Sequence, residues 1–101
     1  VKKFGLRAPM VGHLGDGNFH VLLPYNPEKK ETYEKIRKFS DILIEKTLEL
    51  EGTITGEHGV GLHKKEYLKK EHADNLPTMK LIKRTMDPNN IMNPGKIFDL
   101  N

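Results

Sequence analysis

The stretch GHLGDGNFH, residues 12–20, decides how the first part of this chain folds. It carries three glycines in nine residues and places an Asp-Gly pair midway between two histidines. Asp-Gly favours a two-residue hairpin turn, because both central residues of a type I′ turn need positive φ. Apolar residues stand on both sides of Asp16-Gly17. The stretch therefore predicts two antiparallel strands between about Ala8 and Tyr25.

The same turn predicts a pair of facing histidines. With Asp16 and Gly17 at its centre, His13 lies directly opposite His20. Opposed residues of an antiparallel pair point to the same face, with Cβ atoms about 4.5–5.5 Å apart. Two imidazoles at that spacing can share one metal ion. The alternative is a pair of hydrogen-bonded hairpin histidines without a metal, and the pair alone does not decide between the two.

A second glycine-rich stretch, TGEHGVG at residues 55–61, adds a carboxylate and a third histidine. Two histidines and one acid suit zinc, manganese or ferrous iron and leave positions open for a substrate. In a regular strand Glu57 and His58 would point to opposite faces. Both serve one site only if the backbone is irregular there, which the flanking glycines permit. Neither glycine stretch has the G-x-G-x-x-G spacing of a dinucleotide-binding loop.

The rest of the chain is predicted to be mainly helical. Asn26-Pro27 predicts the start of a long helix that ends near Glu51, with Gly52 as its stop signal. The further elements expected are a short strand at 53–55 and helices at about 64–72 and 74–86, the last ended by Asp87-Pro88. This order predicts an α+β fold, an antiparallel sheet with helices packed on one face.

Composition limits the classes of protein to which the chain can belong. Its 101 residues, 36% hydrophobic and 31% charged, predict one domain with a small core. The absence of cysteine excludes disulfides and thiolate metal sites, and it fits a reducing compartment. We therefore expect a cytoplasmic location, with peripheral attachment to a membrane left open. No transmembrane segment and no nucleic-acid partner are expected, since long apolar runs and basic stripes with aromatic residues are lacking.

Three motifs in order, GHLGDGNFH, TGEHGVG and MDPNNIMNPGKIF, resemble the C-terminal part of FAD-linked oxidases of the vanillyl-alcohol-oxidase-like family. That family includes D-lactate and D-2-hydroxyglutarate dehydrogenases and the glycolate oxidase large subunit. The resemblance covers nearly the whole chain. It implies a partial, ferredoxin-like cap domain over about 1–72 and a helical tail over about 73–101 that returns to an FAD-binding domain.

The resemblance also assigns residues and chemistry. His13, His20 and Glu57 match the family's metal ligands, His58 matches its general base, and Asn93 matches a residue beside the FAD. The implied reaction oxidises a D-2-hydroxy acid to the 2-oxo acid and transfers hydride to the flavin.

The implied partners are a small 2-hydroxy acid, an FAD-binding domain in the same or a neighbouring chain, and an electron acceptor. That acceptor is a quinone, a cytochrome or an electron-transfer flavoprotein. The residues that bind the substrate carboxylate are expected upstream of Val1, so the fragment alone is expected to be inactive. The alternatives are a stand-alone metal-binding α+β module without catalysis and a purely structural domain.

Overall fold

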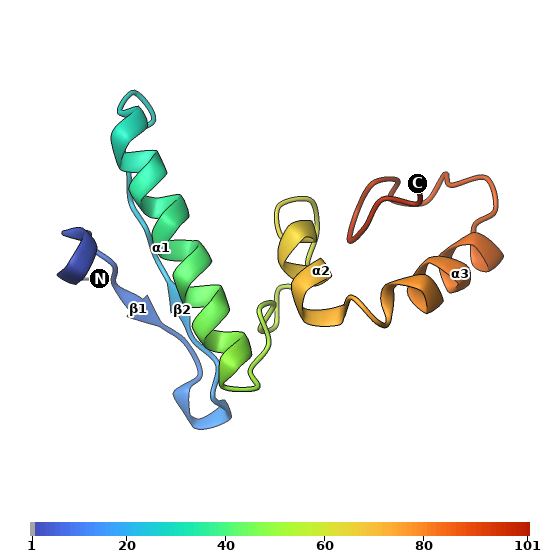
Figure 1. Ribbon diagram of the computed structural model, residues 1–101, viewed down its shortest axis with the longest axis horizontal. Helices are drawn as coiled ribbons and strands as arrows, with labels where there is room; N and C mark the ends of the chain where they lie inside the picture. Colours follow the sequence, from blue (N-terminus) through green and yellow to red (C-terminus); the bar gives the residue numbers. More distant parts are fainter. Residues whose placement is uncertain (1) are drawn as a thin grey trace. The chain divides into compact units, whose positions relative to one another are not determined.

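A computed structural model describes residues 2–101 of the chain, which divides into two compact units at Gly52 and Thr53. The first unit holds a hairpin and a long helix, and the second holds two shorter helices and a long tail (Figure 1). The elements, with η for a 3₁₀ turn, are η1 (Lys2–Phe4), β1 (Met10–Val11), η2 (Leu14–Asp16), β2 (His20–Val21), α1 (Lys30–Glu49), α2 (Lys65–His72) and α3 (Leu76–Met86). The predicted α+β class is confirmed.

The hairpin has a longer loop than the sequence predicted. In the antiparallel β1–β2 pair, Met10 lies opposite Val21 and Val11 lies opposite His20. Residues 12–19 therefore form the connection, and Asp16-Gly17 is not the centre of a two-residue turn. The prediction that His13 lies opposite His20 is wrong.

Backbone hydrogen bonds give the reason for this longer loop. The carbonyl of His13 accepts the N–H groups of Asp16 at 3.0 Å and Asn18 at 3.2 Å, and the Gly17 N–H donates to Leu14 at 3.0 Å. Gly17 has φ +71. The bonds from Asn18 to His13 and from Gly17 to Leu14 close a helical turn that ends in a left-handed glycine, an arrangement known as a Schellman motif. Asp-Gly suits it as well as it suits a type I′ turn.

Helix α1 begins three residues later than an N-cap at Asn26 would place it. The Asn26 side chain accepts the N–H of Glu28 at 3.0 Å, and its carbonyl accepts the N–H of Lys29 at 3.0 Å. Asn26 therefore forms a turn ahead of the helix, a role that its short polar side chain also favours.

Helix α1 ends close to the predicted position, but Glu51 and not Gly52 adopts the left-handed conformation that ends it. Glu51 takes the left-handed conformation, with φ +60, that a glycine usually supplies. Gly52 donates its N–H to the carbonyl of Thr47 at 2.9 Å. A Cβ atom at Gly52 would lie 2.9 Å from the Thr47 Cγ2, so Gly52 is required by close approach.

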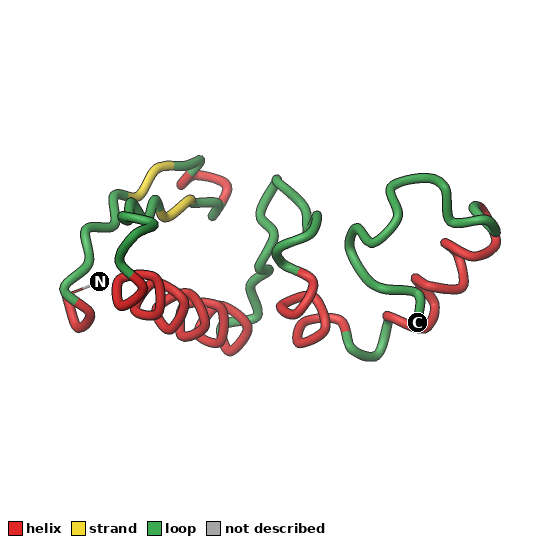
Figure 2. The backbone as a smooth tube through the Cα atoms, turned by 90° about the horizontal axis from the view of Figure 1, so that it is seen from above, coloured by secondary structure: helices red, strands yellow, loops and turns green. Residues whose placement is uncertain are grey.

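The first unit has a small aromatic core. Phe39, on α1, is buried, and the ring of Phe4 meets it edge-on at 6.0 Å between centroids. The rings of Tyr25 and Tyr33 lie 5.9 Å apart and fix the approach to the helix. The hairpin lies along one side of α1 in both views (Figures 1 and 2).

The second unit is built around Ile54, Leu68 and Phe98, which are all buried. The predicted strand at 53–55 is wrong: this segment is a bend without a pairing partner among residues 2–101. Helices α2 and α3 confirm the two predicted helices to within two residues. The tail then turns back along them (Figure 2), and Asp99 meets Lys65 of α2 at 3.0 Å.

Within residues 2–101, none of the helices has both the length and the apolar character needed to cross a bilayer.

Substitution of Gly12 tests the hairpin loop. An alanine Cβ there would lie 2.6 Å from both the Asn18 carbonyl oxygen and the Phe19 Cα, at a φ of +154. We expect Gly12→Ala to lower the free energy of unfolding by about 2 kcal/mol. Gly15→Ala is the matched control, because its Cβ meets nothing within 4 Å. Equal urea midpoints for the two variants would contradict the description of this loop.

Candidate functional site

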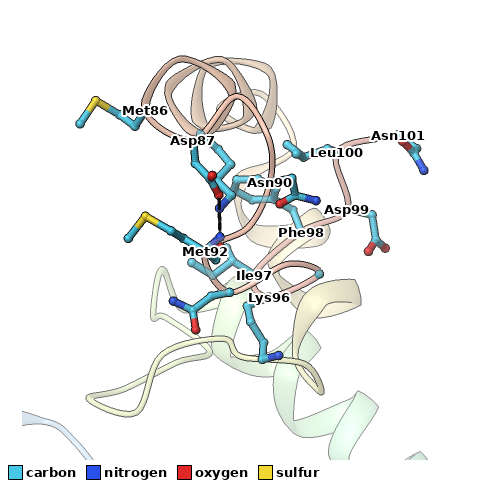
Figure 3. A pocket seen from close by; sticks show the side chains of 13 residues that line it. Met86, Asp87, Asn90, Met92, Lys96, Ile97, Phe98, Asp99, Leu100 and Asn101 are labelled. Carbon is cyan, nitrogen blue, oxygen red and sulfur yellow. Dashed lines mark hydrogen bonds and ion pairs between the residues drawn. The ribbon is translucent and has the colours of Figure 1, made fainter.

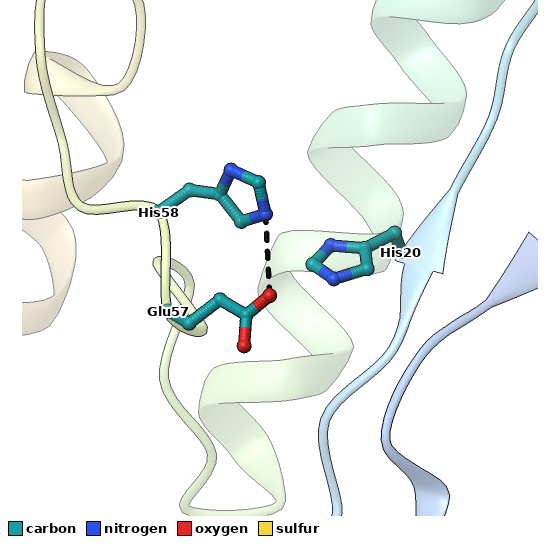
Figure 4. Close-up of side chains that lie close together, drawn as sticks. All are labelled: His20, Glu57 and His58. Atoms are coloured by element: carbon teal, nitrogen blue, oxygen red, sulfur yellow. Dashed lines mark ion pairs between the residues drawn. The ribbon is translucent and has the colours of Figure 1, made fainter.

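A β-turn brings the carboxylate and the imidazole of two adjacent residues together. The N–H of His58 donates to the carbonyl of Thr55 at 3.1 Å, which closes the turn. Gly56, its second residue, has φ +51. The Glu57 Oε1 and His58 Nε2 atoms lie 3.5 Å apart, the interaction drawn as a dashed line in Figure 4. The irregular backbone that the sequence required at this point is therefore present.

The Glu57 and His58 side chains are accessible. Their exposed fractions are 50% and 65%. Glycines with positive φ follow the turn at Gly59 and Gly61, so the chain leaves in an irregular path and not as a strand or helix. A carboxylate and an imidazole that face solvent and each other can bind a cation or exchange a proton with a small molecule.

The two hairpin histidines occupy different positions. His20 lies on β2 and is half-buried, whereas His13 lies in the loop just before η2 and is exposed. Within residues 2–52 no three potential ligand atoms lie within 4.8 Å of one another, and the same holds within 53–101. Neither unit by itself therefore gathers three metal ligands.

Asn93 lines an open pocket of about 520 Å³. This pocket lies between the end of α3 and the tail (Figure 3). The backbone of Asn93 is left-handed, with φ +47. Apolar side chains that share the wall are those of Met86, Met92 and Phe98. The Oδ1 atom of Asn90, in the same wall, is buried and has no hydrogen-bond partner among the described residues. The pocket thus combines an apolar wall with amide groups, which suits a small molecule with both apolar and polar parts.

Asp87 holds the loop that leads to Asn93. Its carboxylate is buried and accepts the backbone N–H of Ile91 at 3.1 Å. It also accepts the backbone N–H of Met92 at 3.0 Å (Figure 3). It also pairs with the Lys83 ammonium group. The hydrogen bond from Lys83, followed by those from the backbone, keeps the pKa of Asp87 below its ordinary value. Sequence analysis used Asp87 only as a helix end and missed this role, although Asp before Pro-Asn-Asn is a turn signal.

Ile97 is strained. It has φ +70, which a β-branched residue rarely adopts and which costs on the order of 1–3 kcal/mol. The N–H of Phe98 donates to the Lys96 carbonyl at 2.8 Å across Ile97, which makes a γ-turn. The N–H of Ile97 donates to the carbonyl of Gly61 at 2.8 Å. No sequence pattern pointed to this contact.

The chain belongs to the family of FAD linked oxidases, C-terminal domain, whose description it matches over residues 1–97. The resemblance carried by the three motifs is therefore confirmed.

Relatives in this family bear the names of three kinds of enzyme. The chain is 44% identical over 94 residues to the mitochondrial D-lactate dehydrogenase [cytochrome] of Arabidopsis thaliana, covering 92% of this chain and 17% of the relative. It is 41% identical to glycolate oxidase subunit GlcD of Bacillus subtilis, covering 95% and 21%. It is also 41% identical to D-2-hydroxyglutarate dehydrogenase of Stutzerimonas stutzeri, covering 86% and 19%. The chain thus spans about a fifth of the length of these relatives.

The lowered pKa of Asp87 predicts an acid-sensitive tail. A depressed carboxyl pKa stabilises the folded state at pH values above the unfolded pKa of about 3.9, and this contribution is lost as pH falls through the folded value. We expect Asp87→Asn to lower the urea midpoint at pH 7, because a neutral amide forms no ion pair with Lys83 and has one acceptor oxygen where the carboxylate has two. The difference from the wild type should shrink steadily below about pH 4.

Asp74→Asn is the control for this prediction, since Asp74 is an exposed aspartate in the turn before α3. It should leave the midpoint at pH 7 almost unchanged. A constant difference between Asp87→Asn and the wild type from pH 7 to pH 3 would show that the charge of Asp87 is not what stabilises the loop.

Proposed function

We propose that this chain contributes the proton-accepting and metal-binding half of the active site of an FAD-dependent D-2-hydroxy acid dehydrogenase. The relatives' names refer to D-lactate, glycolate and D-2-hydroxyglutarate. All three are 2-hydroxy acids, so the shared substrate unit is a hydroxyl beside a carboxylate. The observation that carries the proposal is the turn that brings the side chains of Glu57 and His58 together.

The residues present fit a divalent metal ion by their donor chemistry. His13 and His20 offer neutral imidazole nitrogens, and Glu57 offers a hard carboxylate oxygen. This set suits zinc, manganese or ferrous iron and leaves coordination positions open. Such an ion, when bound, would lower the pKa of a coordinated hydroxyl group. We propose His13, His20 and Glu57 as its ligands.

His58 is the proposed general base. An alcohol hydroxyl has a pKa near that of water, about 16, which lies roughly nine units above that of an imidazole in a model peptide. Forming a free alkoxide across this gap of roughly nine units would require about 12 kcal/mol. His58 therefore accepts the proton either as the hydride leaves or after the hydroxyl has been made more acidic. The positive charge that it acquires faces the Glu57 carboxylate at 3.5 Å.

Other parts of the proposed active site lie outside this turn. FAD, when bound, supplies the acceptor for the hydride from the substrate carbon. We propose that Asn93 contributes an amide beside it, since Asn93 lines the pocket between the end of α3 and the tail. The cap region at about 1–72, the tail at about 73–101 and the cytoplasmic location stay predictions. A cytochrome is the favoured electron acceptor, because the Arabidopsis relative carries that word in its name.

The base is tested by His58→Gln in the complete flavoenzyme. The amide cannot accept the proton, so kcat should fall by about 10² to 10⁴, the usual contribution of a general base. Metal content should stay at the wild-type level, and the loss of rate on the acid side of the pH–rate profile should flatten. His63→Gln, another exposed histidine of the same unit, is the control. An unchanged pH–rate profile for His58→Gln would remove it as the base.

The metal ligands are tested by His13→Ala and Glu57→Gln. Each should lower the metal content of the purified enzyme, measured by elemental analysis, and turnover should fall with it. Mutation of a residue that only supports a metal ligand typically weakens metal affinity by about 10- to 100-fold. Loss of a ligand itself should weaken it at least as much. His63→Ala should retain both metal and turnover. Full turnover of the wild type after exhaustive chelation would end the metal assignment, and metal retained by a His58→Gln enzyme without turnover would separate binding from catalysis.

A further inference from the structure

The part of the tail that lines the pocket makes three successive contacts with the rest of its unit. The N–H of Ile97 reaches the Gly61 carbonyl at 2.8 Å, Asp99 pairs with Lys65 of α2 at 3.0 Å, and the Leu100 carbonyl accepts a hydrogen bond from Arg84 of α3. The first of these contacts joins the tail to the glycine-rich stretch, three residues after His58.

The other end of that stretch is also fixed. Ile54 is 7% exposed, and its N–H points at the carboxylate of Glu71 at 3.5 Å. The Glu71 side chain is only 10% exposed and lies on α2. The segment from Ile54 to Gly61, which carries Glu57 and His58, is thus attached at both ends to the core of the second unit. Two glycines with positive φ, Gly56 and Gly59, lie between these attachments, and glycine restricts the backbone less than other residues do.

We propose that the tail segment 96–98 is a positioning element for the turn Thr55–His58, acting through the hydrogen bond from Ile97 to Gly61. This inference rests on the proposed role of His58 as the base. Ile97 is held at φ +70, and its neighbour Phe98 is buried at 9% exposure. The burial of Phe98 and the pairing of Asp99 hold the γ-turn in place. The strained conformation directs the Ile97 N–H at Gly61.

The experiment removes this one N–H group. The α-hydroxy analogue of isoleucine, inserted at position 97 of the complete flavoenzyme by nonsense suppression, replaces the amide by an ester and keeps the side chain. We expect kcat to fall by about ten- to a hundredfold, since small misplacements of catalytic groups have effects of this size. KM for the 2-hydroxy acid should change less than about twofold, because a displaced base affects turnover more than binding.

The same analogue at Ile82 is the matched control. Ile82 lies inside α3 and is 59% exposed, so the ester there deletes one helical hydrogen bond with the same chemistry. The melting temperature and the visible absorption spectrum of the flavin report on folding and on FAD content for both proteins. A kcat for the ester at 97 equal to that of the ester at 82 would overturn the proposal.

A double-mutant cycle separates this inference from the proposed function. If the tail acts through His58, the ester at 97 causes no further loss of kcat in a His58→Gln enzyme. An undiminished loss in that background would overturn the positioning role and leave His58 as the base. A His58→Gln enzyme with wild-type kcat would instead refute the proposed function itself.

A second pair of variants probes the other side of the hydrogen bond. Gly61 has φ +57, and a Cβ there meets nothing within 4 Å. Gly61→Ala therefore disturbs only the backbone conformation, whereas asparagine tolerates the left-handed region better. We expect Gly61→Ala to lower kcat and Gly61→Asn to restore most of it. Equal kcat values for the two variants and the wild type would contradict the positioning role.

Discussion

The turn Thr55–His58 is the constraint on which the candidate site depends. Adjacent residues of an extended chain point to opposite faces, and those of a helix point about 100° apart. Here the hydrogen bond from His58 to Thr55, with Gly56 in the left-handed region, turns both neighbouring side chains to one side. A carboxylate and an imidazole are thereby brought to 3.5 Å from each other within four successive residues.

The glycines of this stretch, and those of the hairpin loop, indicate where the backbone departs from regular strand or helix. The sequence indicated that Glu57 and His58 could act together only through an irregular backbone, and the structure contains one. The hairpin was a harder case, because Asp16-Gly17 fits two local motifs equally well. A two-residue turn and a Schellman closure both need a left-handed glycine, and they differ in hydrogen bonds that no residue type fixes. The register of His20, now opposite Val11, depends on that choice.

Local signals were reliable where one residue decides the outcome. The ends of α1 and α3 lie within a few residues of the positions that Gly52 and Asp87-Pro88 indicated. Contacts between distant residues could not be read in this way. Examples are the hydrogen bond of Ile97 to Gly61 and the bend at Ile54, a buried residue where a strand was expected. Propensity is a weak guide where tertiary packing of this kind decides the conformation.

The shape of this turn also limits which changes in chain length this segment can accept. Most surface loops accept inserted residues at small entropic cost, because their ends stay fixed while the middle lengthens. An extra residue between Gly56 and His58 would instead rotate one of the two functional side chains away from the other. A missing residue would do the same. The number of residues in this segment is therefore constrained as tightly as their identity.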